Sequence, residues 1–346
     1  MTNKPSYAIL FVTSKCNSKC KMCFNWRNSE EDGKNDLTTT EYELISKKWN
    51  NIFHISLTGG EPLLRNDLNE IVAHFYNNSN TKSVGLTTNG LLPDKTESTI
   101  VSILRSNPNI KLKLSVSIDA IGAMHDNIRG IEGSFEKATE TINKTKHYIK
   151  KYNNFELRIN LTYCHYNEDD ITSIIDCLDD TFGIPINIGI VRGDAREAET
   201  KEVSAEGYRA ATEYIRNKYK KRKNASYLFR MLDNVIFGVY DITYRTLTEK
   251  RHIIDCVAGK NMLILNEKGY VLPCEMLAHV FPGHKFIFPD LRQYNYDINS
   301  ALKSTEFKNV LEHIKTTNCF CTYECATMNS IIYNPLILCK ILLNFK

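Results

Sequence analysis

The sequence predicts an α/β protein, built as a partial (β/α)6 barrel of the TIM type with a C-terminal cysteine-rich extension of a β-hairpin and helices. Two observations lead to this prediction. Short apolar runs alternate about six times with helical stretches over about 190 residues, which calls for a parallel sheet with right-handed crossovers. Chemically reactive residues follow the strand ends, where α/β barrels place their active sites. We therefore assign residues 1–200 to the barrel, 201–250 to a helical linker and 251–346 to the extension.

Each predicted strand is a short apolar run that ends at a turn or loop, as buried strands do. The first runs into three cysteines, the second into Gly59 and Gly60, the third into Asn89 and the fourth into Asp119. The expected strands are residues 7–12, 54–58, 83–88, 111–118, 155–162 and 185–191. This arrangement predicts that one end of the barrel holds the chemistry.

Helical stretches follow the first five strands. The first begins at Thr38–Glu41, because hydroxyl side chains cap a helix and Glu41 lies in its first turn. The fourth, residues 135–150, is amphipathic with a basic outer face. The other helices are expected around residues 68–75, 96–104 and 171–178, and residues 28–34 are expected to form a loop.

Composition excludes several classes of protein. A net charge of +4 over 346 residues gives no support for nucleic acid as a partner. No apolar run is long enough to cross a bilayer, and no signal-peptide core precedes Cys16, so we expect no transmembrane segment and a cytoplasmic protein. Eleven cysteines in a reducing compartment are unsuited to a disulfide framework. The clustered ones are therefore candidate metal ligands.

Three cysteines, Cys16, Cys20 and Cys23, fall within eight residues immediately after the first strand. Soft thiolates held in one small volume suit a zinc ion or an iron–sulfur cluster. With three protein ligands, a four-iron cluster would keep one iron open, and that iron could bind a small molecule directly. A structural zinc loop that lacks its fourth ligand is the alternative.

This cysteine spacing, together with Gly59-Gly60-Glu61-Pro62, resembles the radical S-adenosylmethionine (SAM) superfamily, whose open iron chelates the amino and carboxylate groups of SAM. The resemblance implies that the tetrapeptide lines the methionine end of SAM. Glycines would let the backbone approach the ligand, Glu61 would pair with its ammonium group and Pro62 would stiffen the turn. One departure is Met22, which stands where the family usually has an aromatic residue. Phe24 is expected to supply part of that apolar wall.

The resemblance implies further SAM contacts at the strand ends. In the family these positions reach the ribose and the methionine carboxylate, and a nearby arginine often binds that carboxylate. Ordinary loop polar groups would explain the same residues. The matching residues are Thr88, Asn89, Ser117, Asp119 and Arg129, with Ile190 as a flat edge for adenine.

The C-terminal cysteines resemble the SPASM and twitch extensions of radical SAM enzymes, which bind auxiliary four-iron clusters. Twelve residues separate Cys256 from Gly269, and four separate Gly269 from Cys274, across a predicted hairpin. The chain has fewer C-terminal cysteines than a full SPASM set, so we expect one auxiliary [4Fe–4S] cluster. Its expected ligands are Cys256, Cys274 and Cys325, completed by Cys319 or Cys321. A structural zinc site is the alternative.

The resemblance implies a radical SAM oxidoreductase. A donor such as flavodoxin or ferredoxin would reduce the first cluster, SAM would be cleaved to methionine and a 5′-deoxyadenosyl radical, and the radical would abstract a substrate hydrogen. The auxiliary cluster could then accept an electron and complete a two-electron oxidation. Glu275 follows Cys274, where sulfatase-maturating relatives have an acidic base. A surface or hairpin-capping carboxylate is the other interpretation of Glu275.

Three substrate hypotheses remain open at this point. The substrate could be a small polyol or amino sugar, a carrier-linked group, or a residue of a ribosomally made peptide. Only about six residues precede the first strand, so we expect any leader-binding module to be a separate protein, which slightly favours the small or carrier-linked substrate. A non-catalytic iron–sulfur or zinc protein for binding or electron relay is the alternative from another class. The turn at Gly59–Pro62 argues against it, since an electron carrier needs no SAM site.

Overall fold

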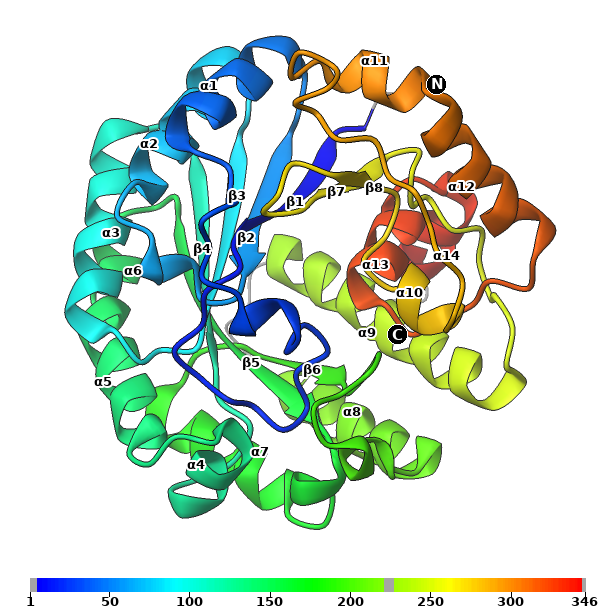
Figure 1. The fold of residues 1–346 in the computed structure, drawn as a ribbon. Helices are drawn as coiled ribbons and strands as arrows, with labels where there is room; N and C mark the ends of the chain where they lie inside the picture. Colours follow the sequence, from blue (N-terminus) through cyan, green and yellow to red (C-terminus); the bar gives the residue numbers. More distant parts are fainter. Residues whose placement is uncertain (1–4, 221–226, 344–346) are drawn as a thin grey trace.

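The computed structural model describes residues 5–220 and 227–343. Its strands form one sheet in the order β6-β5-β4-β3-β2-β1-β7-β8, in which β1 to β6 are parallel (Figure 1). The sheet does not close on itself, so the predicted partial barrel is confirmed. The strands are β1 (Tyr7–Thr13), β2 (His54–Gly59), β3 (Ser83–Thr88), β4 (Lys111–Ser117), β5 (Phe155–Tyr163), β6 (Ile186–Ile190), β7 (Met262–Leu265) and β8 (Val271–Leu272).

Helices cover the outer face of the curved sheet, as the alternating pattern predicts (Figure 1). Those that follow the first five strands are α1 (Thr39–Lys48), α2 (Leu68–Asn78), α3 (Pro93–Ser106), α5 (Ser134–Lys146) and α7 (Ile171–Phe182). A capping box joins Thr38 and Glu41 at the start of α1, as expected. The predicted helix over 135–150 is divided at His147, where α5 gives way to the short α6 (Tyr148–Lys151). A further short helix, α4 (Ala123–Arg129), lies in the loop after β4 and was not predicted.

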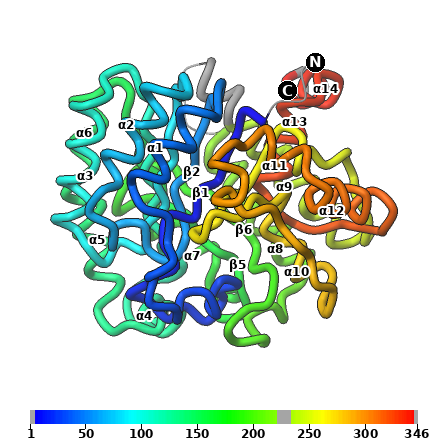
Figure 2. Tube along the Cα trace, turned by 45° about the horizontal axis from the view of Figure 1, so that its top comes forward, coloured from blue at the N-terminus to red at the C-terminus, as the bar shows by residue number. Residues whose placement is uncertain are grey.

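The region assigned as a helical linker contains α8 (Ala205–Lys220) and α9 (Tyr227–Glu249), and residues 221–226 lie outside the described part. The extension adds α10 (Leu277–Val280), α11 (Ile298–Lys303), α12 (Thr305–Thr316), α13 (Glu324–Ile332) and α14 (Pro335–Leu343). The helices α12, α13 and α14 lie across the molecule from α3 and α5 in both views (Figures 1 and 2). No single helix in the described ranges has the length and apolarity to cross a membrane, although α13 and α14 meet that test together as a pair bent by 94°.

The predicted hairpin forms, because β7 and β8 pair in antiparallel fashion. Its position was not predicted. β7 lies beside β1 in parallel register, with Tyr7 opposite Met262 and Leu10 opposite Leu265. The strand that leads into the cysteine loop is therefore hydrogen-bonded on one side by the barrel and on the other by the extension.

The two faces of the sheet differ in chemistry. Along β4, Leu112, Leu114 and Val116 are fully buried against the helices, whereas the alternate residues point into the barrel and are only half-buried. Those inward residues are polar: Lys113, Ser115 and Ser117 on β4, and Glu156, Arg158, Asn160 and Thr162 on β5. The main apolar core thus lies between the sheet and its helices.

The free edge of β6 is capped by side chains. The Tyr219 hydroxyl accepts a hydrogen bond from the Ile186 amide. The Tyr240 hydroxyl accepts one from the Ile188 amide at 3.1 Å. Oε1 of Glu324 accepts one from the Ile190 amide at 3.0 Å. An uncapped edge would offer these groups to another chain. Helices α8, α9 and α13 thus close the side of the barrel that the sheet leaves open.

We expect Tyr240→Phe to lower the free energy of unfolding by about 1–3 kcal/mol, because the buried Ile188 amide would lose its acceptor. Urea denaturation measures this. Tyr152→Phe is the matched control, since Tyr152 directly follows α6 and lies outside the helices α8, α9 and α13 that cap β6. Equal effects of the two variants would contradict the assigned role.

Candidate active site at the cysteine loop

A cavity of about 210 Å³ lies at the carboxyl ends of the barrel strands. It brings together most of the residues predicted from the sequence. Those that line it are Cys16, Cys20, Cys23, Gly59, Gly60, Glu61, Thr88, Asn89, Ser117, Arg129 and Ile190. Phe24, which was expected to supply part of an apolar wall, lines it as well, and so does Met22. Pro62 and Asp119 are buried beside it.

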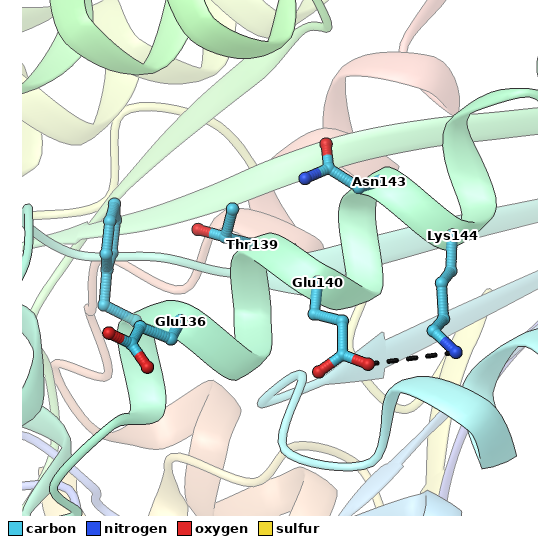
Figure 3. A pocket seen from close by; sticks show the side chains of 6 residues that line it. Glu136, Thr139, Glu140, Asn143 and Lys144 are labelled. Carbon is cyan, nitrogen blue, oxygen red and sulfur yellow. Dashed lines mark ion pairs between the residues drawn. The ribbon is translucent and has the colours of Figure 1, made fainter.

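A larger hollow, of about 520 Å³, follows one side of α5 (Figure 3). All of its lining residues come from that one helix, and Glu140 and Lys144 form an ion pair along it. No predicted site residue lies there. We therefore place the chemistry in the smaller cavity.

Residues from the end of α4 hold the cysteine loop from one side. The Lys19 and Lys21 amides donate to the carbonyls of Arg129 and Ile128 at 3.1 and 2.9 Å. Nη1 of Arg129 lies 3.5 Å from Sγ of Cys20, and the Ser18 hydroxyl lies 3.1 Å from the same sulfur. The Ser18 hydroxyl donates to the Arg129 carbonyl at 3.0 Å, so the Arg129 guanidinium is the donor that faces the sulfur. Such a contact is typical around metal-bound thiolates.

Burial raises the pKa of Cys16 to about 12 and that of Cys23 to about 11. In the described residues no group of three or more His, Cys, Asp or Glu side chains converges on the position of a single metal ion. The three loop thiols nevertheless line the same cavity. Three thiols that line one cavity fit the ligand set of a cluster that keeps one iron open.

The glycines of the Gly59–Pro62 turn have a role that the sequence did not reveal. A Cβ on Gly60 would lie 2.0 Å from the Lys15 carbonyl oxygen, and one on Gly59, whose φ is +137°, would lie 2.4 Å from that of Thr13. The Gly60 amide donates to the Thr13 carbonyl at 2.8 Å, and the Glu61 amide donates to the Lys15 carbonyl at 2.7 Å. The glycines therefore allow the turn to pack closely on the backbone that leads into the cysteine loop. This role is additional to the expected close approach of the glycine backbone to a ligand.

Glu61 lies at the base of the cavity and is almost fully buried. Its carboxylate accepts hydrogen bonds from the Thr88 hydroxyl at 2.9 Å, the Asn89 amide at 2.8 Å and the Leu63 amide at 3.1 Å. Burial raises the pKa of Glu61, and these donors partly offset that effect. Asn89 also donates from its side chain to Asn17 at 2.8 Å. The second strand, the third strand and the cysteine loop are thus fixed to one another around one carboxylate.

Asp119 acts on the cavity through Arg129. Its Oδ2 lies 2.6 Å from Nε of Arg129, its Oδ1 accepts from the Thr162 amide at 2.8 Å, and its side chain is fully buried. Arg129 itself lines the cavity. The sequence placed Asp119 among the SAM contacts, and that assignment stays a prediction. The contacts seen here make it the residue that positions Arg129.

We expect Asp119→Asn to lower the free energy of unfolding by about 3–5 kcal/mol, because a buried arginine would lose its counter-ion. Urea denaturation of the metal-free protein measures the change. Asp94→Asn is the control: its side chain is 87% exposed in an ion pair with Lys144, so its loss should leave the free energy of unfolding nearly unchanged. A cost for Asp119→Asn no larger than that of the control would contradict the assigned role.

The extension reaches the cavity through Arg192, which the sequence analysis missed. The guanidinium lines the cavity, contacts Glu324 at 2.5 Å and Glu275 at 3.5 Å, and lies over the rings of Phe24 and Tyr323. Arg196 lines the cavity as well and lies over Trp26. Both follow the sixth strand, so the strand-end rule used for the other residues would have found them. Arg192 connects the cysteine loop with the predicted base Glu275.

The C-terminal cysteines share a second apolar cluster, formed with β1 residues Ile9 and Phe11. The cysteines in or against this cluster are Cys256, Cys274, Cys319, Cys321 and Cys325. Cys274 is buried and directly precedes Glu275. The structure therefore brings together the C-terminal thiols that the sequence predicts as a second ligand group. They lie on the side of β1 where β7 pairs.

Comparisons with known proteins agree with this geometry. Residues 10–178 match the family model described as Radical SAM superfamily. The AdoMet-dependent heme synthase of Methanosarcina barkeri is 28% identical over 294 residues, which are 80% of this chain and 78% of the synthase. GTP 3′,8-cyclase of Pasteurella multocida is 30% identical over 165 residues, or 45% of this chain. The alignment spans only 49% of the cyclase.

Solved structures share the fold. Streptococcus suis SuiB bound to S-adenosylmethionine has a TM-score of 0.63 at 15% identity, over 89% of this chain and 68% of SuiB. Native anSMEcpe with bound AdoMet has a TM-score of 0.58 at 15% identity, over 98% of this chain and the full length of anSMEcpe. At such identity the likeness concerns the fold alone.

Proposed function

We propose that the chain is a radical SAM oxidoreductase that acts on a small polar or carrier-linked substrate. The reason is that the chain belongs, through residues 10–178, to the Radical SAM superfamily. Membership implies a [4Fe–4S] cluster and SAM. The observation that carries the proposal is the docking of the Gly59–Pro62 turn on the cysteine loop, since the two segments line one cavity and together would bind SAM. When bound, the cluster and SAM supply a 5′-deoxyadenosyl radical that abstracts a hydrogen atom from the substrate.

The residues of the cavity divide this work. Cys16, Cys20 and Cys23 would hold the cluster, and the hydrogen bond from Arg129 to Cys20 would stabilise its thiolate. Glu61 is the acidic group of the cavity and would face the ammonium group of SAM, and the Arg129 guanidinium would face its carboxylate. Thr88, Asn89 and Ser117 remain proposed contacts to SAM, with Ile190 against the adenine.

We further propose one auxiliary [4Fe–4S] cluster, which would supply an electron acceptor for a two-electron oxidation. The gathering of five cysteines in one apolar cluster supports it. Cys256, Cys274 and Cys325 are the proposed ligands, with Cys319 or Cys321 as the fourth. A structural zinc ion is the competing occupant.

Glu275 is the proposed proton acceptor in this oxidation. Burial raises the pKa of Glu275, against the opposing effect of Arg192, which makes it a stronger base than an exposed glutamate. Arg192 contacts it at 3.5 Å and also lines the cavity, so the pair links the proposed base to the reaction space. This contact is the observation that supports Glu275 over a surface role.

A small substrate is favoured over a peptide by the heme synthase relative, which aligns over 78% of its own length and, by its name, makes a small molecule. A radical SAM peptide maturase is the second candidate, and a non-catalytic iron–sulfur protein the candidate of another class. A flavodoxin or ferredoxin as donor and a cytoplasmic location belong to the same proposal.

The proposal is tested by anaerobic reconstitution with iron and sulfide, reduction with dithionite and addition of SAM. We expect 5′-deoxyadenosine and methionine in equal amounts, and no cleavage with Cys16→Ala/Cys20→Ala/Cys23→Ala. Cluster formation without SAM cleavage would contradict the enzymatic proposal and favour a relay protein.

A further inference from the structure

Glu324, the first residue of α13, contacts two neighbouring residues of the barrel. Its Oε1 accepts a hydrogen bond from the Ile190 amide at 3.0 Å, and its Oε2 lies 2.5 Å from Nη1 of Arg192. These partners precede it in the chain by 134 and 132 residues. The Glu324 side chain is only 18% exposed, and hydrogen bonds to an ionised group are among the strong ones. A carboxylate of the extension therefore holds the end of the sixth strand.

The residues held in this way form one wall of the cysteine-loop cavity. Ile190, Val191 and Arg192 are consecutive, and all three line the cavity. The Val191 amide donates to the Tyr163 carbonyl of β5 at 3.0 Å, which fixes the segment on its inner side. On its outer side β6 is the edge of the sheet, so Glu324 takes the place that a further strand would have. A displacement of the Glu324 carboxylate would therefore release one side of this wall.

A glycine on β6 gives the carboxylate room to approach the strand. A Cβ on Gly189 would lie 3.2 Å from Oε1 of Glu324 and 3.7 Å from its carboxyl carbon. The first distance is tighter than an ordinary contact, so a side chain at position 189 would push the carboxylate away from the Ile190 amide. Gly189 and Glu324 thus form one packing unit across the boundary between barrel and extension.

Arg192 extends the same connection to the cysteine loop. Its guanidinium lies over the ring of Phe24 in that loop, at 5.4 Å, and over the ring of Tyr323, at 5.0 Å. Tyr323 directly precedes Glu324, and its side chain is almost fully buried. The Arg192 side chain is therefore held between the cysteine loop and the start of α13, with Glu324 as its nearest carboxylate.

We propose that Glu324 is a positioning residue that couples the C-terminal extension to SAM binding. SAM in the cavity would fix the wall at residues 190–192, and the carboxylate bound to that wall would be fixed with it. Because such coupling is reciprocal, an ordered first turn of α13 would in turn strengthen SAM binding. Cys325, a proposed ligand of the auxiliary cluster, lies in that turn beside Glu324. This inference rests on the proposed function, which places SAM in the cavity, and adds the residue that connects SAM with the extension.

Equilibrium dialysis of radiolabelled SAM against the reconstituted enzyme, without reductant, measures the first half of this coupling. We expect Glu324→Ala to weaken SAM binding by about tenfold or more, since the cavity wall loses its hydrogen bonds to a charged group. Glu324→Gln keeps an acceptor for the Ile190 amide and should recover part of the affinity. Gly189→Ala, which leaves the carboxylate in the chain but displaces it, should also weaken binding. Glu312→Ala is the matched control, because Glu312 is exposed on α12 of the same extension.

Amide hydrogen exchange measures the second half, which a purely structural role of Glu324 would not affect. In the wild type, SAM should slow exchange in the first turn of α13 as well as at residues 190–192. In Glu324→Ala the effect of SAM on α13 should disappear, and in Glu324→Gln part of it should remain.

Two results would overturn the inference: equal SAM affinity in Glu324→Ala and Glu312→Ala, or protection of α13 by SAM that persists in Glu324→Ala. A wild-type enzyme that binds no SAM would overturn the proposed function and this inference with it. The two failures are therefore distinguished by the wild type alone.

Discussion

Cys16→Ala/Cys20→Ala/Cys23→Ala should reduce the iron content of the reconstituted protein from about eight to about four per chain, as two [4Fe–4S] clusters require. Reductive cleavage of SAM should fall to background in the same variant. The reason is local: these thiols line the cavity that also holds Gly59, Gly60 and Glu61. Anaerobic iron and sulfide analysis measures the first change and chromatography of 5′-deoxyadenosine the second.

The matched control is Cys177→Ala/Cys339→Ala, which removes two exposed thiols that belong neither to the cavity nor to the second apolar cluster and should leave the iron content unchanged. A fall from about four irons to none in the triple variant would mean that the C-terminal cysteines hold zinc or no metal. The auxiliary cluster, and with it the two-electron oxidation, would then be given up, whereas the SAM site would remain.

Gly60→Ala should disrupt the same site without touching a metal ligand. The added methyl group would lie 2.0 Å from the Lys15 carbonyl oxygen and 2.4 Å from its carbonyl carbon, and backbone atoms cannot move aside as a flexible side chain can. The turn must therefore leave the cysteine loop. We expect the free energy of unfolding to fall by about 4 kcal/mol or more, with loss of SAM cleavage. Urea denaturation and the dithionite assay measure the two effects.

Gly85→Ala is the control for that variant. Gly85 lies on the neighbouring strand β3, and a Cβ there would meet His54 and Ser56 at an ordinary 3.5 Å. Its free energy of unfolding should change by no more than about 1 kcal/mol in either direction. A Gly60→Ala protein as stable and as active as Gly85→Ala would show that the turn does not need its close approach to the loop.

The barrel was predictable because its signals are local. Each strand is an apolar run and each crossover helix has its own periodicity, so both can be recognised from short stretches of the sequence. The pairing of β7 with β1 was not predictable in this way. These strands are about 250 residues apart, and neither sequence indicates which edge the other will join. The division into 1–200, 201–250 and 251–346 stays a prediction.

The site was predictable where spacing alone identifies it. Cys16, Cys20 and Cys23 and the Gly59–Pro62 turn were found because their chemistry depends on residues close in sequence. Two features were missed. Asp119 and Arg129 are only ten residues apart, but each was interpreted as a SAM contact and not as one half of an ion pair. The position of Arg192 between Glu275 and Glu324 depends on residues that are distant in the sequence. The polar face of β4 was predictable in principle, since Lys113, Ser115 and Ser117 alternate with apolar residues.

The position of β1 between β2 and β7 has a consequence for synthesis on the ribosome. Translation at about 5–20 residues per second separates the emergence of these partners by roughly 12–50 s. During that interval the strand that leads into the cysteine loop has one edge without its partner, next to three reactive thiols. A nascent chain in this state is open to strand addition by other chains and to oxidation. From this topology we expect the region around β1 to fold more slowly than the barrel wall formed by β2 to β5. We also expect it to need a chaperone until residue 265 has emerged.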